Sequence, residues 1–77
     1  MMSGFGDVTL EDPVGYLGTG AGTIEVILGQ SPAYYQLHAD REDFDALLAV
    51  LVAAWKTSSP VRATIRGTAI VAVEPAA

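Results

Sequence analysis

The sequence predicts a mainly β protein with one helix, a small barrel in the order strand, strand, strand, helix, strand, strand. Two observations predict this class. Short runs of alternating apolar and polar residues recur along the chain, and a period of two is typical of half-buried strands. One long apolar run lies between the third and fourth of them. The length of 77 residues predicts a single domain over 1–77, with frayed ends at 1–6 and 75–77.

The first strand is expected within residues 7–17, DVTLEDPVGYL. Pro13 and Gly15 interrupt this segment, and both residues are typical of strand edges and bulges. We therefore predict either one irregular strand or two short ones. The glycine-rich residues 18–22, GTGAG, are expected to form a loop. Their glycines precede a strand and lack the GxGxxG spacing, so no dinucleotide site is predicted.

The other strands follow from alternation. Residues 23–29 and 33–39 each place apolar side chains on one face, and the QSP at 30–32 indicates a turn between them. Two alternating runs joined by a short turn predict an antiparallel hairpin. Two more strands, at 61–66 and 68–74, are expected to end the fold.

A helix is predicted from about Arg41 to Thr57, with Asp40 as its N-cap and the SSP at 58–60 ending it. One side of this helix is bulky and is expected to pack on the sheet as part of the core. Its residues are Phe44, Leu47, Leu48, Leu51 and Trp55.

The opposite side of the helix is also apolar, because residues 46–55, ALLAVLVAAW, contain no polar side chain. Small side chains allow close approach by another helix, so we expect this side to contact sister copies rather than water. The predicted oligomer interface is Ala46, Ala49, Val50 and Ala53. The alternative is that these small residues are simply exposed, since scattered apolar surface is normal.

Composition favours the oligomer. A chain of this size has a thin core and often needs a disulfide, a metal or oligomerisation for stability. There are no cysteines, which removes disulfides and thiolate metal sites. Charged residues are only 17 % of the chain, against a typical ~25 %. We therefore predict that the chain's main partner is itself.

Charge and length exclude other partners. Nine acidic residues against four basic ones give a net charge of −5, which argues against duplex DNA. The apolar run at 46–55 is too short to span a bilayer, which needs about 20 residues. No signal peptide is expected in MMSGFGDVTL. The sequence is compatible with a cytoplasmic protein and with a mature secreted one, so localisation is left unknown.

Residues 22–75, GTIEVILGQSPAYYQLHADREDFDALLAVLVAAWKTSSPVRATIRGTAIVAVEP, place the helix between the third and fourth strands, as in an OB-fold. Element by element, this segment resembles the pentameric B subunits of cholera-like and heat-labile enterotoxins. The resemblance implies an OB-fold whose copies form a ring of five, with their helices around a central pore.

Several features depart from that toxin pattern. The toxin subunits are larger, begin with an extra helix and carry a disulfide, whereas this chain has no cysteine. Their sugar site uses a tryptophan on the strand after the helix. Here that strand is VRATIRG, and the one tryptophan, Trp55, is on the predicted helix. The resemblance therefore carries over ring assembly and no sugar-binding residue.

A polar constellation predicts a ligand site independently of the resemblance. An aromatic ring beside amide and guanidinium donors suits a sugar or a carboxylate. The candidate residues are Tyr34, Gln36, His38, Arg62 and Arg66. The alternative is that they lie on the outside of the barrel, or that the two arginines pair with acidic residues of a neighbouring subunit.

Catalysis and cofactors are not predicted. His38 is the one candidate general base, and no G-x-S-x-G elbow accompanies it. The acidic residues between Asp40 and Asp45 lack the spacing of a calcium loop, so no metal site is predicted. A non-catalytic self-assembling module is the leading hypothesis, and a carbohydrate-binding module is the second. A small enzyme that depends on His38 is a distant third. Binding of single-stranded nucleic acid through Tyr34 or Tyr35 is a further distant alternative, since four basic residues give little charge for phosphates.

Overall fold

The computed structural model describes residues 7–29 and 33–76, and the predicted turn at 30–32 lies outside the described residues. The fold is mainly β with one helix, in the predicted order. In chain order the elements are β1 (Val8–Gly20), β2 (Thr23–Leu28), β3 (Tyr35–His38), α1 (Phe44–Thr57), β4 (Pro60–Arg66) and β5 (Ala69–Pro75). The five strands form one closed sheet in the order β1-β2-β3-β5-β4, with β4 paired back onto β1.

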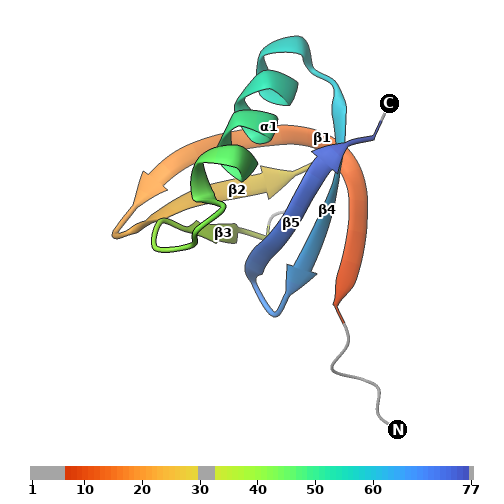
Figure 1. Cartoon of the computed structure of the whole chain (residues 1–77). Coiled ribbons are helices and arrows are strands. Elements are labelled where there is room, and N and C mark those ends of the chain that lie inside the picture. Colours follow the sequence, from red (N-terminus) through yellow and green to blue (C-terminus); the bar gives the residue numbers. More distant parts are fainter. Residues whose placement is uncertain (1–6, 30–32, 77) are drawn as a thin grey trace, which may run out of the picture.

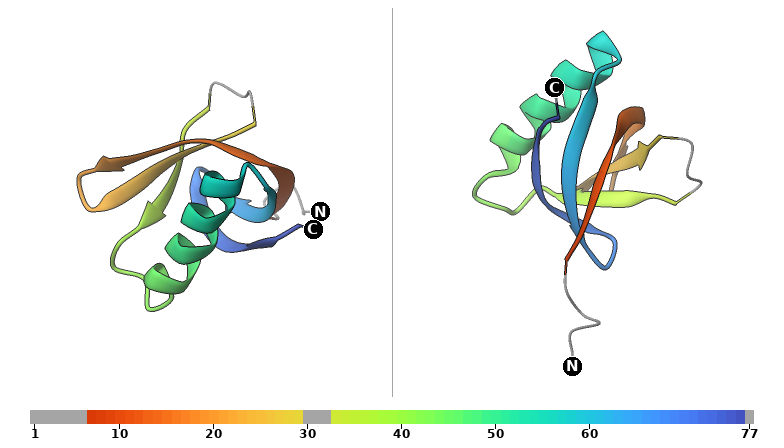
Figure 2. Two further views of the ribbon diagram at one scale, coloured as in Figure 1. Left: turned by 90° about the horizontal axis from the view of Figure 1, so that it is seen from above. Right: turned by 90° about the vertical axis from the view of Figure 1, so that its right-hand side faces the viewer.

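Strand β1 closes the sheet because it pairs with two partners. Its first part runs along β4, from Val8 opposite Ile65 to Pro13 opposite Pro60. Its second part runs along β2, and the register shifts at Gly15, between Val14 and Tyr16. The predicted irregularity is therefore a bulge within one continuous strand, which curves around the molecule in Figures 1 and 2.

The prediction of a loop at 18–22 is wrong for residues 18–20, which belong to a strand. Gly18 pairs with Glu25 and Gly20 with Thr23, so β1 continues to Gly20. The turn is limited to residues 21–22, where Gly22 has a φ of 71°. A Cβ at Gly20 would lie 2.7 Å from Thr23 Oγ1, so glycine here fits under the side chains of the neighbouring strand.

The remaining pairings complete the sheet. Strands β2 and β3 form the predicted antiparallel hairpin, and β4 and β5 form a second one. Strand β3 lies parallel to β5, where Gln36 is opposite Ala69. The sheet encloses a core with no buried polar side chain among the described residues. The buried residues are Val14, Val26, Leu28, Leu37, Leu47, Leu51, Ala54, Val61, Ala63, Ile65, Ile70 and Val73.

The helix begins later than predicted. Its first residue is Phe44 and its N-cap is Asp43, so neither Asp40 nor Arg41 belongs to its start. The Asp43 carboxylate caps no backbone N–H. Instead it accepts two hydrogen bonds from Arg41, which also donates one to the backbone carbonyl of Val71 on β5. Residues 39–43 therefore form a turn tied to the sheet.

The helix ends at Thr57, before SSP as predicted. Its cap is Ser58, which adopts a left-handed conformation with φ 56° and ψ 34°. The N–H of Ser59 donates to the carbonyl of Ala54 at 2.9 Å, so the last carbonyls of α1 are satisfied before β4 begins.

The side of the helix that packs on the sheet differs slightly from the predicted one. Leu47, Leu51 and Ala54 are buried, and Phe44 and Leu48 pack partly against the core. Trp55 was predicted to be a core residue, and this is wrong, because it is 47 % exposed. The small side chain of Ala54 lies against the sheet in its place, which leaves the indole at the edge of the helix.

The described part of the C-terminus pairs with the start of β4. Pro75 is the last residue of β5 and pairs with Val61. The N–H of Ala76 donates to the carbonyl of Pro60 at 3.2 Å. Residues 75 and 76 therefore contact β4, whereas 1–6 and 77 lie outside the described residues.

We expect Leu51→Ala to lower the free energy of unfolding by about 2–5 kcal/mol, because it leaves a cavity in a fully enclosed site. Leu48→Ala removes the same atoms from a partly buried position and serves as the matched control, with a smaller loss. Urea unfolding of both variants measures the difference. Equal losses would contradict the observed rotation of the helix.

Candidate functional site

The five predicted ligand residues lie in β4 and in or just before β3, and β5 separates these two strands in the sheet. Arg62 lies on β4 and is held by two carboxylates of its own chain: Nη2 is 3.1 Å from Glu11 Oε2, and Nη1 is 3.0 Å from Glu74 Oε1. Arg66, at the other end of β4, binds Asp7 through two hydrogen bonds of 2.8 and 3.2 Å. Both arginines are therefore engaged by carboxylates of their own chain.

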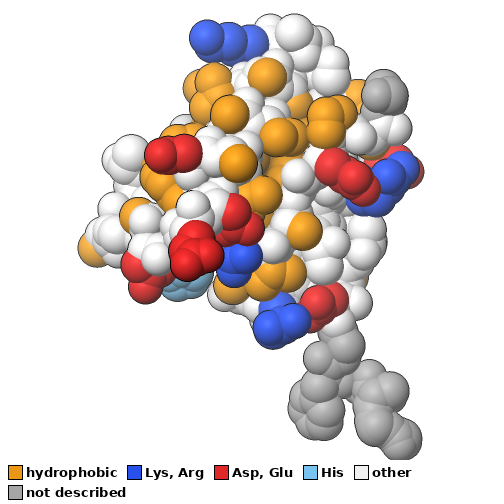
Figure 3. All heavy atoms as spheres, in the orientation of Figure 1, with side chains coloured by type: hydrophobic (Ala, Val, Ile, Leu, Met, Phe, Trp, Pro, Cys, Tyr) orange, Lys and Arg blue, Asp and Glu red, His pale blue; other side chains and the backbone are white. Residues whose placement is uncertain are grey.

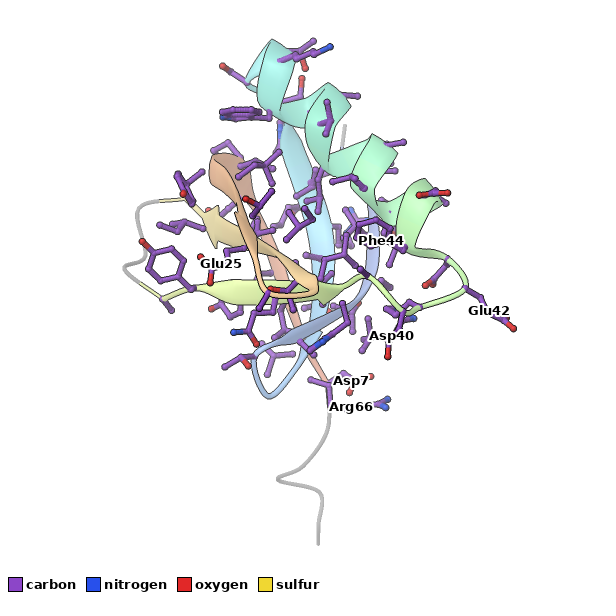
Figure 4. The ribbon with its side chains drawn as sticks, turned by 90° about the vertical axis from the view of Figure 1, so that its left-hand side faces the viewer. Asp7, Glu25, Asp40, Glu42, Phe44 and Arg66 are labelled. Atoms are coloured by element: carbon purple, nitrogen blue, oxygen red, sulfur yellow. The ribbon has the colours of Figure 1, made fainter. Side chains whose placement is uncertain are left out.

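The Asp7–Arg66 pair lies two strands away from Gln36, because Arg66 is opposite Ala69 of β5 and Ala69 is opposite Gln36. Figure 4 shows Asp7 beside Arg66, with Glu25 on a different part of the surface. The hydrogen bonds from Arg66 lower the pKa of the Asp7 carboxyl. The sequence left open that these arginines pair with acidic residues of a neighbouring subunit. In the structure they pair instead with acidic residues of their own chain.

Tyr34, Gln36 and His38, the other three candidates, lie on the outer side of the sheet. Leu37 between them is buried, so Gln36 and His38 on either side of it point away from the core. The register places Glu25 of β2 opposite Gln36 and Gly18 of β1 opposite Glu25. Sequence reasoning missed Glu25, although the hairpin register aligns it with Gln36.

Tyr16 is the second residue that was missed. Its ring meets the ring of Tyr34 edge to face, with centroids 6.1 Å apart, and both side chains are about half exposed. Tyr16 also lies over Gly18, where a Cβ would collide with its ring. We call this surface the tyrosine–glutamate face; it consists of Tyr16, Glu25, Tyr34, Gln36 and His38.

The predicted oligomer interface lies on the outward side of α1, where Ala46, Ala49 and Ala53 are exposed and Val50 is partly buried. An open apolar hollow of about 400 Å³ runs between the second half of this helix and the end of β5. We call it the α1–β5 groove. Its lining residues are Ala49, Val50, Ala53, Ala54, Thr57 and Pro75.

The apolar character of this side extends beyond the groove. Figure 3 shows hydrophobic side chains along the helix and across onto the strand beside it, with charged side chains around the margin. Such a contiguous apolar area marks an interaction surface more often than scattered apolar residues do.

A second apolar hollow, of about 190 Å³, lies on the other side of the same helix, toward β1 and β2. Exposed Trp55 forms one wall of it. We call this the Trp55 surface. Its residues are Leu17, Gly18, Thr19, Ile24, Leu48, Val52 and Trp55. Sequence reasoning placed Trp55 in the core and therefore did not predict this surface.

The acidic residues before the helix do not gather around a common point. Asp43 is engaged by Arg41, whose hydrogen bonds lower the pKa of the Asp43 carboxyl. Across residues 7–29 and 33–76, no group of three or more His, Asp or Glu side chains is arranged to hold a metal ion. Within the same residues, no helix has the length and apolarity needed to cross a membrane.

Comparison of the chain with protein-family models, with curated proteins and with solved structures gives no match.

The lowered pKa values of Asp7 and Asp43 predict acid sensitivity. A carboxyl whose pKa is depressed by folding stabilises the native state above its unfolded pKa of about 3.9 and loses that contribution as the pH falls through the folded value. We expect the melting temperature to fall below about pH 4, and to fall less steeply in Asp43→Asn. Thermal unfolding followed by circular dichroism from pH 7 to acid measures both curves. Parallel curves would contradict a role for the Arg41–Asp43 pair.

Proposed function

We propose that this chain is a self-assembling, non-catalytic module whose copies pack against one another through the outward side of α1. The observation that carries the proposal is the α1–β5 groove, an open apolar hollow in the surface of a small domain. His38, the candidate general base, lies exposed at the end of β3, away from this groove.

A second copy fits the groove better than a small ligand does. Small-molecule sites combine apolar walls with a few converging polar groups that fix orientation. Thr57 is the one polar side chain that lines this groove, and its hydroxyl already bonds to Ser59 Oγ and to the helix backbone. A purely apolar hollow along a helix is instead typical of packing between elements, where each Å² removed from water contributes about 25 cal/mol.

We further propose that the closed sheet is an OB-fold barrel and that the assembly is a ring of five. The strand order β1-β2-β3-β5-β4, with the parallel pair β3–β5 and a helix between β3 and β4, supports the fold. The resemblance to enterotoxin B subunits supports the number of copies. Five chains of 8.0 kDa would weigh about 40 kDa.

We expect Ala53→Glu to break the assembly into 8.0 kDa chains, because it places a carboxylate in the floor of every contact, where charge burial is costly. Native mass spectrometry at micromolar concentration measures the mass. Thr9→Glu is the control: Thr9 is exposed on β1, far along the chain from the groove, and this variant should keep the wild-type mass. A wild-type protein that is monodisperse at 8.0 kDa would refute self-assembly.

Carbohydrate binding is a second candidate function, and the tyrosine–glutamate face favours it. Tyr16 and Tyr34 offer half-exposed rings, on which the C–H face of a sugar can lie, and Glu25 and Gln36 offer hydrogen-bonding groups in one row across the strands. No lysine or arginine occurs in β2 or β3. This acidic surface disfavours single-stranded nucleic acid, whose phosphates need positive charge.

A glycan array with the wild-type protein tests this second function. For any glycan bound, we expect Tyr34→Ala to weaken the affinity by about tenfold or more, as loss of one stacking ring would. Glu42→Gln, in the turn before α1, is the control and should bind as the wild type does. Absence of binding to every glycan, or equal affinities for both variants, would refute this function.

A further inference from the structure

We infer that the contact between copies is head to tail: the Trp55 surface of one copy packs into the α1–β5 groove of the next. This inference rests on the proposed function and specifies its partner and its geometry. The positions of the two surfaces, their shapes and the charges beside them are complementary between copies.

The two apolar surfaces lie on opposite sides of one helix. Val50 lines the groove and Val52 lines the Trp55 surface. At about 100° per residue, side chains two positions apart point about 160° away from each other. The two hollows share no residue. Each copy can therefore offer its Trp55 surface to one neighbour and its groove to another at the same time.

The shapes of the two surfaces are complementary. The groove is floored by alanines, which leave room for a large side chain. Trp55 is the largest side chain of the chain and leaves 47 % of its surface exposed. Binding hot spots at protein interfaces are typically formed by an aromatic side chain, often tryptophan, that fills a pocket of the partner.

The charges next to the two surfaces are also complementary. Lys56 follows Trp55 directly, and among the four basic residues it alone forms no ion pair with the described residues. At the other surface, Glu74 precedes the groove residue Pro75. There Glu11 and Glu74 share the single positive charge of Arg62, which leaves one negative charge in excess. Seating Trp55 in the groove of a neighbour would bring Lys56 toward this excess charge.

The contact proposed here joins two different surfaces, so it is heterologous, and repetition of it generates a ring or an open fibre rather than a two-fold dimer. A groove-to-groove contact would generate the two-fold dimer instead. The distinction matters for the experiment, because a heterologous contact can be rescued by mixing two complementary variants and a two-fold contact cannot.

The test mixes two variants that are each defective at one surface. Ala53→Glu blocks the groove and keeps the Trp55 surface, whereas Trp55→Ala keeps the groove. We expect each variant alone to be a monomer, and the equimolar mixture to form a heterodimer of about 16 kDa, two chains of 8.0 kDa, because one intact contact remains and growth then stops. Native mass spectrometry measures the masses, and far-ultraviolet circular dichroism checks that each variant is folded. If Trp55→Ala does not fold, Val52→Glu on the same surface replaces it.

The outcomes separate this inference from the function on which it rests. If the wild type is monomeric, self-assembly itself fails. If the wild type assembles but Trp55→Ala keeps its full mass, or if the two monomeric variants form no heterodimer, head-to-tail packing is overturned while self-assembly through the groove stands.

Charge reversal gives a second, independent measurement. We expect Lys56→Glu to raise the dissociation constant of the assembly, and the double variant Lys56→Glu/Glu74→Lys to restore it toward the wild-type value. Asp45→Lys, a charge reversal elsewhere on the helix, is the control that should not rescue Lys56→Glu. Failure of Glu74→Lys to rescue, or equal rescue by Asp45→Lys, would overturn the pairing of Lys56 with Glu74.

Discussion

The fold depends on the bend of β1 at Gly15. One strand must pair with β4 over its first half and with β2 over its second half, and only a change of direction between Val14 and Tyr16 allows this. The backbone approaches closely at that point, since a Cβ on Gly15 would lie 2.7 Å from the carbonyl oxygen of Gly29. A larger residue would separate β1 from the end of β2. Glycine at position 15 permits this close approach, and the pairing of β1 with β4 closes the sheet, so that neither strand has a free edge there.

Closure of the sheet determines what the helix can do. The strands already surround most of the core, so α1 has only one end of the sheet to cover. It buries a narrow stripe of side chains there, formed by Leu47, Leu51 and Ala54. The helix surfaces on either side of that stripe, which line the α1–β5 groove and the Trp55 surface, therefore lie outside the core. In a larger domain another layer would cover them. Here the helix has apolar residues on nearly every side, and within residues 7–29 and 33–76 no further element covers these flanks, which is the physical reason for proposing a second copy.

Much of the fold could be predicted from the sequence, because alternation in β2, β3 and β4 reports directly which side of each strand faces the core. The parts that could not be predicted depend on distant contacts. The start of α1 was misplaced because the carboxylate of Asp43 binds Arg41, which is anchored to β5, and local propensity contains no sign of this. Trp55 was misplaced because a rotation by one residue exchanges it with Ala54. The ion pair of Arg62 with Glu11 could not be predicted either, since it joins residues 51 positions apart.

The distribution of charge connects these surfaces. Three of the four basic side chains are used within the chain, each beside a carboxylate at the surface of the sheet or its adjoining turn. The two pairs of Arg62 join β4 to β1 and to β5, and the Arg66–Asp7 pair joins β4 to the residue before β1. In the turn before α1, Arg41 pairs with Asp43 and also donates a hydrogen bond to the carbonyl of Val71 on β5. The outward side of the helix receives one cation, Lys56, beside an otherwise apolar area. Such a surface can pack against an apolar surface and can also attract an acidic one. A second copy of this chain offers both, because 51 % of its residues are hydrophobic and its net charge is −5.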